Sequence, residues 1–303
     1  MFRLNDFILL MVIYSSMLAG ILLPHVGAIF QPYPVYLMIF LLFLSFLSIE
    51  IETIWDTVRN HTQAVIWLCF LKLIALPLTV YLLFRGFYPS YAIAALLLTG
   101  ISTGVVAPFV STIVNANVNL VLVMVVISSV FAPFTLPALV KLLLARSIEI
   151  SLIGMIRILC MVIFVPILAV ETLRRLTPKA LEAIMKRRYP ISLVIFAVVN
   201  LGVFSRYSDF FLQNPSIILE ATLVAMVLGG IYLVVGILTL WKSPVENQLA
   251  SAIILGNMNN VLVLVFASEF FSPLEPTVAA MYMIPFFGLI LPLRVYPRLR
   301  KTD

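Results

Sequence analysis

The sequence predicts an all-α polytopic membrane protein with ten transmembrane helices, arranged as two inverted five-helix repeats. Three observations lead to this fold class. The 303-residue chain is 63% hydrophobic and 11% charged, with a mean hydropathy of +1.17, whereas a soluble domain carries about 25% charged residues. The apolar residues gather into ten runs that are long enough to cross a bilayer. Two of these runs, one in each half, are interrupted by polar residues and glycines.

The ten expected spans are joined by short connections. Counting apolar runs of suitable length gives 7–24, 33–49, 62–84, 89–114, 118–144, 150–172, 191–205, 216–241, 247–271 and 276–293. The first run is long enough to be a span, so we expect no cleavable signal peptide. The longest polar stretch, Arg174–Pro190, is too short to form a soluble domain.

The distribution of basic residues predicts the orientation. If the N-terminus is cytoplasmic and the loops alternate, the cytoplasmic segments hold thirteen lysines and arginines and the outer loops hold four. Cytoplasmic loops of membrane proteins carry such an excess of positive charge. We therefore expect both termini in the cytoplasm. The net charge of +6 then reflects membrane topology and is no sign of nucleic-acid binding.

The two interrupted spans are the fourth and the ninth. The first interruption lies in Thr99–Pro108, which reads Thr-Gly-Ile-Ser-Thr-Gly-Val-Val-Ala-Pro, and the second is Gly256-Asn-Met-Asn-Asn260. Interrupted hydrophobic segments in corresponding halves point to the binding site of a secondary transporter. A helix break leaves backbone groups unpaired, which is tolerated at membrane depth only inside protein or beside a water-filled cavity.

Five spans per half is an odd number, so two homologous halves must insert with opposite orientation. We expect residues 1–146 to form the first repeat and residues 147–303 the second. The segment 132–137, Ala-Pro-Phe-Thr-Leu-Pro, corresponds to 284–292, Ile-Pro-Phe-Phe-Gly-Leu-Ile-Leu-Pro, because each follows its half's interrupted span by a similar distance.

These segments resemble the bile acid:sodium symporter family. The resemblance is clearest over 97–142, which includes Leu-Leu-Thr-Gly-Ile-Ser-Thr-Gly-Val-Val-Ala-Pro-Phe and Asn-Ala-Asn-Val-Asn-Leu, and it continues at 255–265. It implies a panel of spans 1, 2, 6 and 7 and a core of spans 3–5 and 8–10. It also implies that the two broken helices cross within the core.

The chain departs from the family at the positions of its sodium ligands. Sodium-coupled members carry a Ser-Asn pair after the first break, hydroxyl residues on span five, and an acidic residue and a glutamine at the second break. Alignment places Ala107, Pro108, Val121, Val125, Leu255 and Asn259 there. Sodium needs several hard oxygen ligands, so the resemblance with these departures predicts sodium-independent transport. Sodium symport with main-chain ligands stays open as the alternative.

Lys72 is the departure with the clearest consequence. The family's sodium-coupled members carry a glutamine five residues before the proline of span three, and here that position is Lys72, before Pro77. A lysine at a helix centre costs about 2.5–3.5 kcal/mol, so it should face protein or water. Its ammonium could replace a bound sodium as a fixed charge, or carry a coupling proton. The alternative is that it snorkels elsewhere.

The candidate substrate-binding residues lie mainly at the two breaks: Thr99, Ser102, Thr103, Asn257, Asn259 and Asn260. The N-termini of half-helices present free N–H groups that suit an anion, although structural polar residues at a crossing would look the same. Arg157 in span six could pair with a substrate carboxylate, or snorkel to the outer interface. No catalytic pair or metal cluster is placed at depth, so we expect no enzyme, no cofactor and no metal.

The resulting expectation is a secondary transporter of a small organic anion, working by alternating access in a bacterial inner membrane. Its partners would be that substrate and the lipid bilayer, with no nucleic acid. Two alternatives stay open. One is a sodium-coupled organic-anion symporter, and the other is a non-transporting membrane receptor or scaffold that keeps the fold.

Overall fold

The computed structural model describes residues 4–47, 58–59, 62–144 and 151–300, and this part of the chain is helical throughout except for turns and one isolated bridge. The first half contains α1 (Leu4–Leu22), α2 (Pro24–Gly27), η1 (Ala28–Phe30), α3 (Pro34–Phe46), α5 (Thr62–Phe70), η2 (Leu71–Ala75), α6 (Leu76–Phe87), η3 (Pro89–Tyr91), α7 (Ala92–Gly100), α8 (Ala107–Val114) and α9 (Val118–Leu144). The expected boundary between the repeats, after residue 146, lies outside the described residues.

The second half contains α10 (Leu152–Leu176), α11 (Pro178–Arg206), α12 (Ser208–Gln213), α13 (Ser216–Thr239), α14 (Val245–Gly256), α15 (Asn260–Phe270), α16 (Leu274–Met281), α17 (Met283–Gly288) and α18 (Ile290–Arg300). Several helices begin as their sequence dictates. Pro34 and Pro178 occupy first-turn positions, where a missing N–H costs nothing. The Ser151 hydroxyl accepts a hydrogen bond from the Gly154 N–H and caps α10.

Within the residues that the structure describes, six helical stretches are long and apolar enough to cross a membrane by themselves. They are Thr62–Phe87, Val118–Leu144, Leu152–Leu176, Ile184–Arg206, Ser216–Thr239 and Leu274–Arg298. A seventh would be the pair Met11–Leu22 and Pro24–Phe30, whose two parts meet at 107°. The expected second, fourth and ninth spans appear within the described residues as shorter apolar helices or as broken ones.

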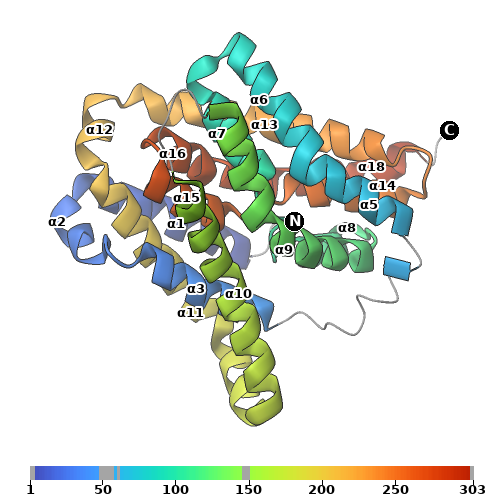
Figure 1. The fold of residues 1–303 in the computed structure, drawn as a ribbon, viewed down its shortest axis with the longest axis horizontal. Coiled ribbons are helices and arrows are strands. Elements are labelled where there is room, and N and C mark those ends of the chain that lie inside the picture. The colour runs from blue at the N-terminus through green and yellow to red at the C-terminus, as the bar shows by residue number, and fades with distance from the viewer. Residues whose placement is uncertain (1–3, 48–57, 60–61, 145–150, 301–303) are drawn as a thin grey trace.

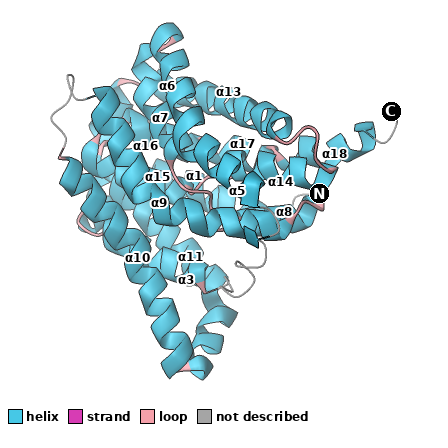
Figure 2. Ribbon diagram, turned by 45° about the vertical axis from the view of Figure 1, so that its right-hand side comes forward, coloured by secondary structure: helices cyan, strands magenta, loops and turns pink. Residues whose placement is uncertain are grey.

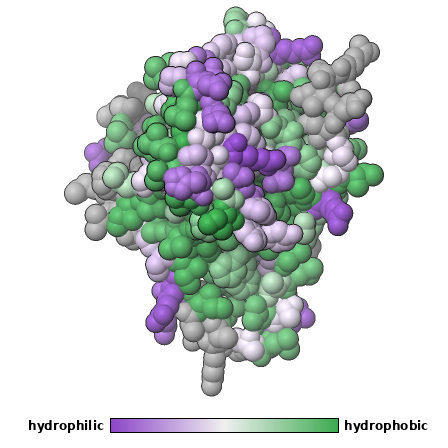
Figure 3. Space-filling model, turned by 90° about the vertical axis from the view of Figure 1, so that its left-hand side faces the viewer, coloured by the Kyte–Doolittle hydropathy of each residue, from purple (hydrophilic) through white to green (hydrophobic). Residues whose placement is uncertain are grey.

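The surface matches a lipid environment. Many large apolar side chains are exposed, among them Phe87 and Ile153, and green apolar residues cover much of the face in Figure 3. In water such an apolar surface would be a liability, but in a bilayer it is the expected outer layer. The protein is a multi-pass membrane protein.

The expectation for the stretch Arg174–Pro190 was wrong in one respect. We took it as a polar connection followed by a span at 191–205, but α11 begins at Pro178 and runs through Pro190 to Arg206. The segment is rich in Ala, Leu, Glu, Lys, Met and Arg, which are strong helix formers. Its polarity therefore excluded it from the expected apolar span, although the α11 helix continues through it. α10 and α11 project together from the other helices (Figures 1 and 2).

The helices pack in two groups. In the first group, α1 lies along α11, and α3 packs against both α10 and α11. In the second group, α6 packs on α7, α13 on α14 and α16, and α15 on α16. The two broken helices, α7–α8 and α14–α15, belong to the second group (Figure 1).

Candidate functional site

The first helix break separates α7 from α8. α7 ends at Gly100, and the next residue, Ile101, has an extended backbone with φ −72° and ψ 162°. The helix restarts at Ala107, with Pro108 in its first turn. A proline there needs no hydrogen-bond partner and presets the helical φ angle. The glycines and the proline seen in the sequence thus define the two sides of the break.

The second helix break separates α14 from α15. α14 ends at Gly256, and α15 begins at Asn260. The Asn259 side chain accepts a hydrogen bond from the Leu262 N–H at 3.3 Å and caps the new helix. Asparagine is among the preferred residues at this position because its side-chain oxygen satisfies a free N–H group.

The two breaks cross and pair with each other. Thr103 and Met258 form an isolated antiparallel bridge. The Gly104 N–H donates to the Asn257 carbonyl at 2.7 Å, and the Asn259 N–H donates to the Ser102 carbonyl at 3.1 Å. Each break therefore satisfies one backbone donor and one acceptor of the other, which removes much of the cost of unpaired groups at membrane depth.

Gly104 is required by the closeness of this crossing. A Cβ atom at Gly104 would lie 2.7 Å from the Met258 carbonyl oxygen and 3.0 Å from its carbon. Both atoms belong to the backbone and cannot turn away. Glycine is the residue that permits such a close approach of two chains.

Lys72 lies beside the first break. It is fully buried in η2, a π-helical turn between α5 and α6, and its Nζ donates a hydrogen bond to the Thr99 carbonyl at 3.1 Å. Thr99 is the penultimate residue of α7, where carbonyls lack partners within the helix and the helix dipole is negative. The ammonium therefore occupies the place where a cation is most favourable, and π-turns of this kind are frequent at functional sites.

Two tyrosines that the sequence analysis did not single out complete this arrangement. The Tyr282 hydroxyl donates to the Gly256 carbonyl at the end of α14 at 2.7 Å. The Tyr232 hydroxyl shares a 2.6 Å hydrogen bond with the Thr99 hydroxyl, and the two tyrosine rings meet edge to face at 5.8 Å. The C-terminal ends of α7 and α14 thus each receive a donor, an ammonium at one and a phenol at the other.

The hydroxyl of Thr103 takes up another carbonyl at the crossing. It donates to the Ile254 carbonyl at 3.0 Å, and the Thr103 N–H donates to the Ser128 hydroxyl at 3.0 Å. Three buried side-chain oxygens at the crossing have no hydrogen-bond partner among the described residues, namely Ser102 Oγ, Asn257 Oδ1 and Asn260 Oδ1. Unpaired buried oxygens are costly and usually call for an explanation.

A cavity of about 540 Å³ lies between the two groups of helices and reaches the crossing. Its walls come from α3 and α11 on one side and from α8, α15, α17 and the two breaks on the other. Most of the lining is apolar, and the polar lining residues are Ser45, Arg188, Tyr189, Ser192, Asn259 and Asn260. This size falls in the range of about 300–1,000 Å³ that is usual for small-molecule sites.

The sequence of this protein was compared with those of known families and proteins. The sequence model of the Sodium Bile acid symporter family matches residues 35–214, more than half of the chain. The chain belongs to this family. The matched region runs from α3 to α12, so it includes the first break and ends before the second. No curated protein matches the chain.

Membership of this family identifies a membrane transport protein. Of the residues that we proposed from the sequence, Asn259 and Asn260 line the cavity. Thr99, Ser102, Thr103 and Asn257 are fully buried in the crossing. Arg157 lies apart from them, with an exposed side chain on α10 and no part in the cavity wall; its role stays a prediction.

The sequence analysis missed four polar residues of the cavity. Ser45 is one of several hydroxyl residues in the apolar run 33–49, and nothing in the sequence sets it apart. Arg188, Tyr189 and Ser192 lie on α11, near the point where the polar segment meets the span. If the sequence analysis had predicted that the span at 191–205 continues as a helix through this polar segment, Arg188 would have been a candidate for the space between the helices.

Proposed function

We propose that the protein is a secondary transporter of an organic anion, which it moves by alternating access without sodium. The observation that carries this proposal is the crossing of two helix breaks in the wall of a cavity, with a buried lysine beside the first break. Membership of the Sodium Bile acid symporter family supports the transport function, whereas the sodium-free part of the proposal rests on Lys72 and on the residues at the expected ligand positions. The crossing supplies backbone and amide groups at membrane depth, where transporters of this kind bind their substrates.

Charge at the crossing favours an anion. The N-terminal ends of α8 and α15 border the cavity through Pro108 and Asn260. These ends carry the positive pole of the helix dipole. The negative C-terminal ends of α7 and α14 face Lys72 and Tyr282 instead. Arg188 adds a positive charge to the cavity wall.

The apolar part of the lining suggests the body of the substrate. Side chains such as Leu41, Phe109 and Phe286 form much of the wall. A small inorganic anion would leave this surface in contact with water. The proposed substrate is therefore an organic anion whose charged group meets the crossing and whose apolar part contacts α3, α11 and α17.

Sodium fits poorly at the positions where the family resemblance would place it. Ala107, Pro108, Val121, Val125 and Leu255 offer no side-chain oxygen. The ammonium of Lys72 already donates to a carbonyl at the end of α7. A hard cation needs several oxygen ligands, so the fixed charge of Lys72 takes the place of a bound sodium in this proposal.

We also propose ten spans in two inverted repeats, with the repeats at 1–146 and 147–303. The symmetry of the crossing supports this arrangement, since Gly104 donates to Asn257 just as Asn259 donates to Ser102. In this proposal α1, α3, α10 and α11 form the panel, and the remaining spans form the core. The positive charge of the expected cytoplasmic segments supports cytoplasmic termini, and short loops favour a bacterial inner membrane.

The sodium-free proposal predicts ligand stabilisation that does not depend on the cation. A bound organic anion should raise the unfolding temperature of the purified protein by the same amount in sodium and in potassium. At a ligand concentration of about 100 times Kd, the free energy of unfolding should rise by about 2.7 kcal/mol. Asn260→Ala should weaken the effect, whereas Asn214→Ala, at an exposed turn, should leave it intact. Stabilisation that requires sodium would instead establish the sodium-coupled alternative.

Alternating access also predicts a closure at the other end of α11. There the Tyr207 hydroxyl donates to the Ser268 carbonyl of α15 at 2.9 Å, and the Arg206 guanidinium donates to the same oxygen at 3.5 Å. Opening of the protein at this end requires these hydrogen bonds to break. Tyr207→Phe removes one of them, worth about 0.5–1.5 kcal/mol, and should raise the open population by about two- to tenfold.

The opening can be measured as maleimide labelling of Ser268→Cys in a chain without its two native cysteines, Cys69 and Cys160. Ser268 is buried, so its labelling rate reports the open population. Tyr296→Phe is the matched control, because it also removes one tyrosine hydrogen bond, the 2.6 Å contact with Gln248, but both of these residues lie in the proposed core. Equal labelling rates in all three backgrounds would show that Tyr207 does not hold this end closed.

A further inference from the structure

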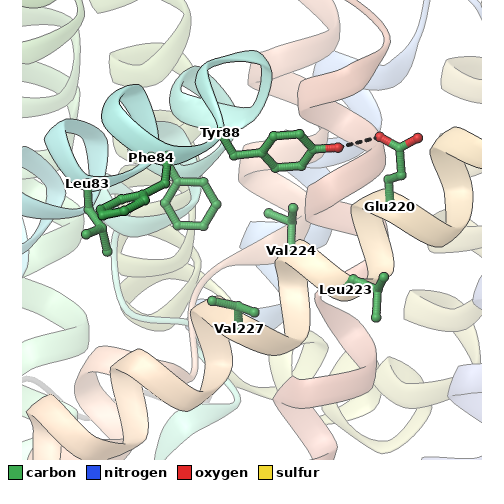
Figure 4. Close-up of a pocket in the computed structure, with 8 residues that line it drawn as sticks. Leu83, Phe84, Tyr88, Glu220, Leu223, Val224 and Val227 are labelled. Carbon is green, nitrogen blue, oxygen red and sulfur yellow. Dashed lines mark hydrogen bonds between the residues drawn. The ribbon is translucent and has the colours of Figure 1, made fainter.

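A second cavity lies on the lipid-facing surface, away from the crossing. It has a volume of about 390 Å³ and is a groove between the end of α6 and the first turns of α13 (Figure 4). Its walls are Leu83, Phe84, Phe87, Leu223, Val224 and Val227. None of these residues lines the cavity at the crossing. The side chains of Phe87, Leu223 and Val227 are exposed, so the groove opens toward the bilayer.

One end of the groove carries a single carboxylate. Glu220 Oε2 accepts hydrogen bonds from the Tyr88 hydroxyl at 2.6 Å and from the Tyr91 hydroxyl at 3.3 Å (Figure 4). The hydrogen bond to Glu220 raises the pKa of Tyr88 above its ordinary value, so this phenol stays a neutral donor. In the part of the chain that the structure describes, Glu220 forms no salt bridge, and its Oε1 accepts no hydrogen bond.

From the ends of two candidate membrane spans we infer that the carboxylate lies near the depth of the lipid headgroups. Tyr88 directly follows the span Thr62–Phe87, and Glu220 lies near the start of the span Ser216–Thr239. Tyrosines gather at this membrane interface because their rings are apolar and their hydroxyls are polar. The groove therefore joins an apolar slot in the hydrocarbon region to a negative, hydrogen-bonding group at its edge.

We propose that this groove binds phosphatidylethanolamine, with an acyl chain along its apolar wall and the ammonium group on Glu220. An ammonium has three N–H donors and a positive charge, which match a carboxylate with a free oxygen. A choline headgroup has the charge but no donor. An anionic headgroup is repelled by the carboxylate. The charge and hydrogen bonding of Glu220 thus select the aminophospholipid among bilayer lipids.

Such a lipid would bridge two helices that support the crossing. α6 packs on α7, whereas α13 packs on α14, and the hydrogen bond from Tyr88 to Glu220 connects them. An acyl chain in the groove would contact Phe84 on one side and Val224 on the other. The bound lipid would therefore stabilise the second group of helices without entering the cavity at the crossing.

The test compares phosphatidylethanolamine, phosphatidylcholine and phosphatidylglycerol of the same acyl composition, added to delipidated full-length protein in detergent. Binding is counted by native mass spectrometry. We expect phosphatidylethanolamine to bind about tenfold more tightly than the other two lipids, as for one charge-assisted contact. Equal binding of the three lipids, or a preference for phosphatidylglycerol, would overturn the proposal.

Variants assign the preference to the groove. Glu220→Gln should remove the preference, because a neutral amide gives up the charge while keeping the shape. Leu223→Trp should lower phosphatidylethanolamine binding by filling the slot. Glu246→Gln is the matched control, since Glu246 is exposed at the start of α14 and does not line the groove, whose α13 residues lie in the first half of that helix. The ratio between lipids is measured on each folded variant, and a ratio that Glu220→Gln leaves unchanged would overturn the proposal.

Discussion

Replacement of Lys72 by methionine is expected to lower transport by at least about tenfold, equivalent to about 1.4 kcal/mol in the rate-limiting barrier. Methionine has a similar length but carries neither charge nor N–H donor. The Thr99 carbonyl at the end of α7 would lose its hydrogen bond, and the site would lose the positive charge that stands in for sodium. The measurement is uptake of the anion into proteoliposomes at equal protein density.

The free energy of unfolding of the Lys72→Met variant should change little, even though its transport rate falls. Loss of a buried hydrogen bond costs about 1–3 kcal/mol, but removal of a fully buried ammonium also relieves its desolvation. Replacing buried charges by apolar groups of similar volume is often neutral or even stabilising. Lys141→Met, at an exposed position on α9, is the control for loss of a lysine. Unchanged transport in Lys72→Met would refute any role for the charge.

Lys72→Arg separates a fixed charge from a proton carrier. Arginine keeps the positive charge but does not release its proton in proteins. Transport by Lys72→Arg with an unchanged pH profile would identify Lys72 as a fixed charge. A pH profile that is flat in this variant, but not in the wild type, would identify it as the carrier of the coupling proton.

Gly104→Ala should have the second largest effect, on stability and transport together. The new Cβ atom would lie 2.7 Å from the Met258 carbonyl oxygen, so the two breaks must separate. Overpacking of this kind costs about 1–3 kcal/mol. Separation would also weaken the 2.7 Å hydrogen bond from Gly104 to Asn257 and leave buried backbone groups unpaired. We expect a lower unfolding temperature and a loss of transport.

Gly230→Ala is the matched control for this substitution. Gly230 lies on α13, and apart from the adjoining backbone of its own helix a Cβ atom there would meet no atom of the described residues within 4 Å. Alanine also suits a helix interior better than glycine, by about 0.5–1 kcal/mol. The control should therefore keep or raise the unfolding temperature. If Gly104→Ala unfolded at the same temperature as Gly230→Ala, the close approach at the crossing would be refuted.

The sequence indicated the breaks because glycine, proline and asparagine interrupt otherwise apolar runs. Gly100, Pro108 and Gly256 belong to the two interruptions, and in the structure they lie at the end of α7, in the first turn of α8 and at the end of α14. Lys72 was conspicuous because an ammonium in the middle of an apolar span is costly. Tyr232 and Tyr282 gave no such signal, because a tyrosine in a span is compatible with packing, with lipid and with hydrogen bonding alike.

The amino-acid sequence by itself determined that this protein lies in a membrane and where its helices are interrupted, and it singled out Lys72 as a charged residue inside a span. These properties follow from local composition, because the cost of polar groups in hydrocarbon is paid residue by residue. The burial of Lys72 came from the structure. Only the tertiary structure decided what the interruptions contact. The pairing of Thr103 with Met258, the donors at the ends of α7 and α14, and the placement of Arg188 in a cavity all join residues far apart in the chain. Such contacts depend on which helices pack against one another, and the local order of residues shows which face of a helix is apolar but not which helix it meets.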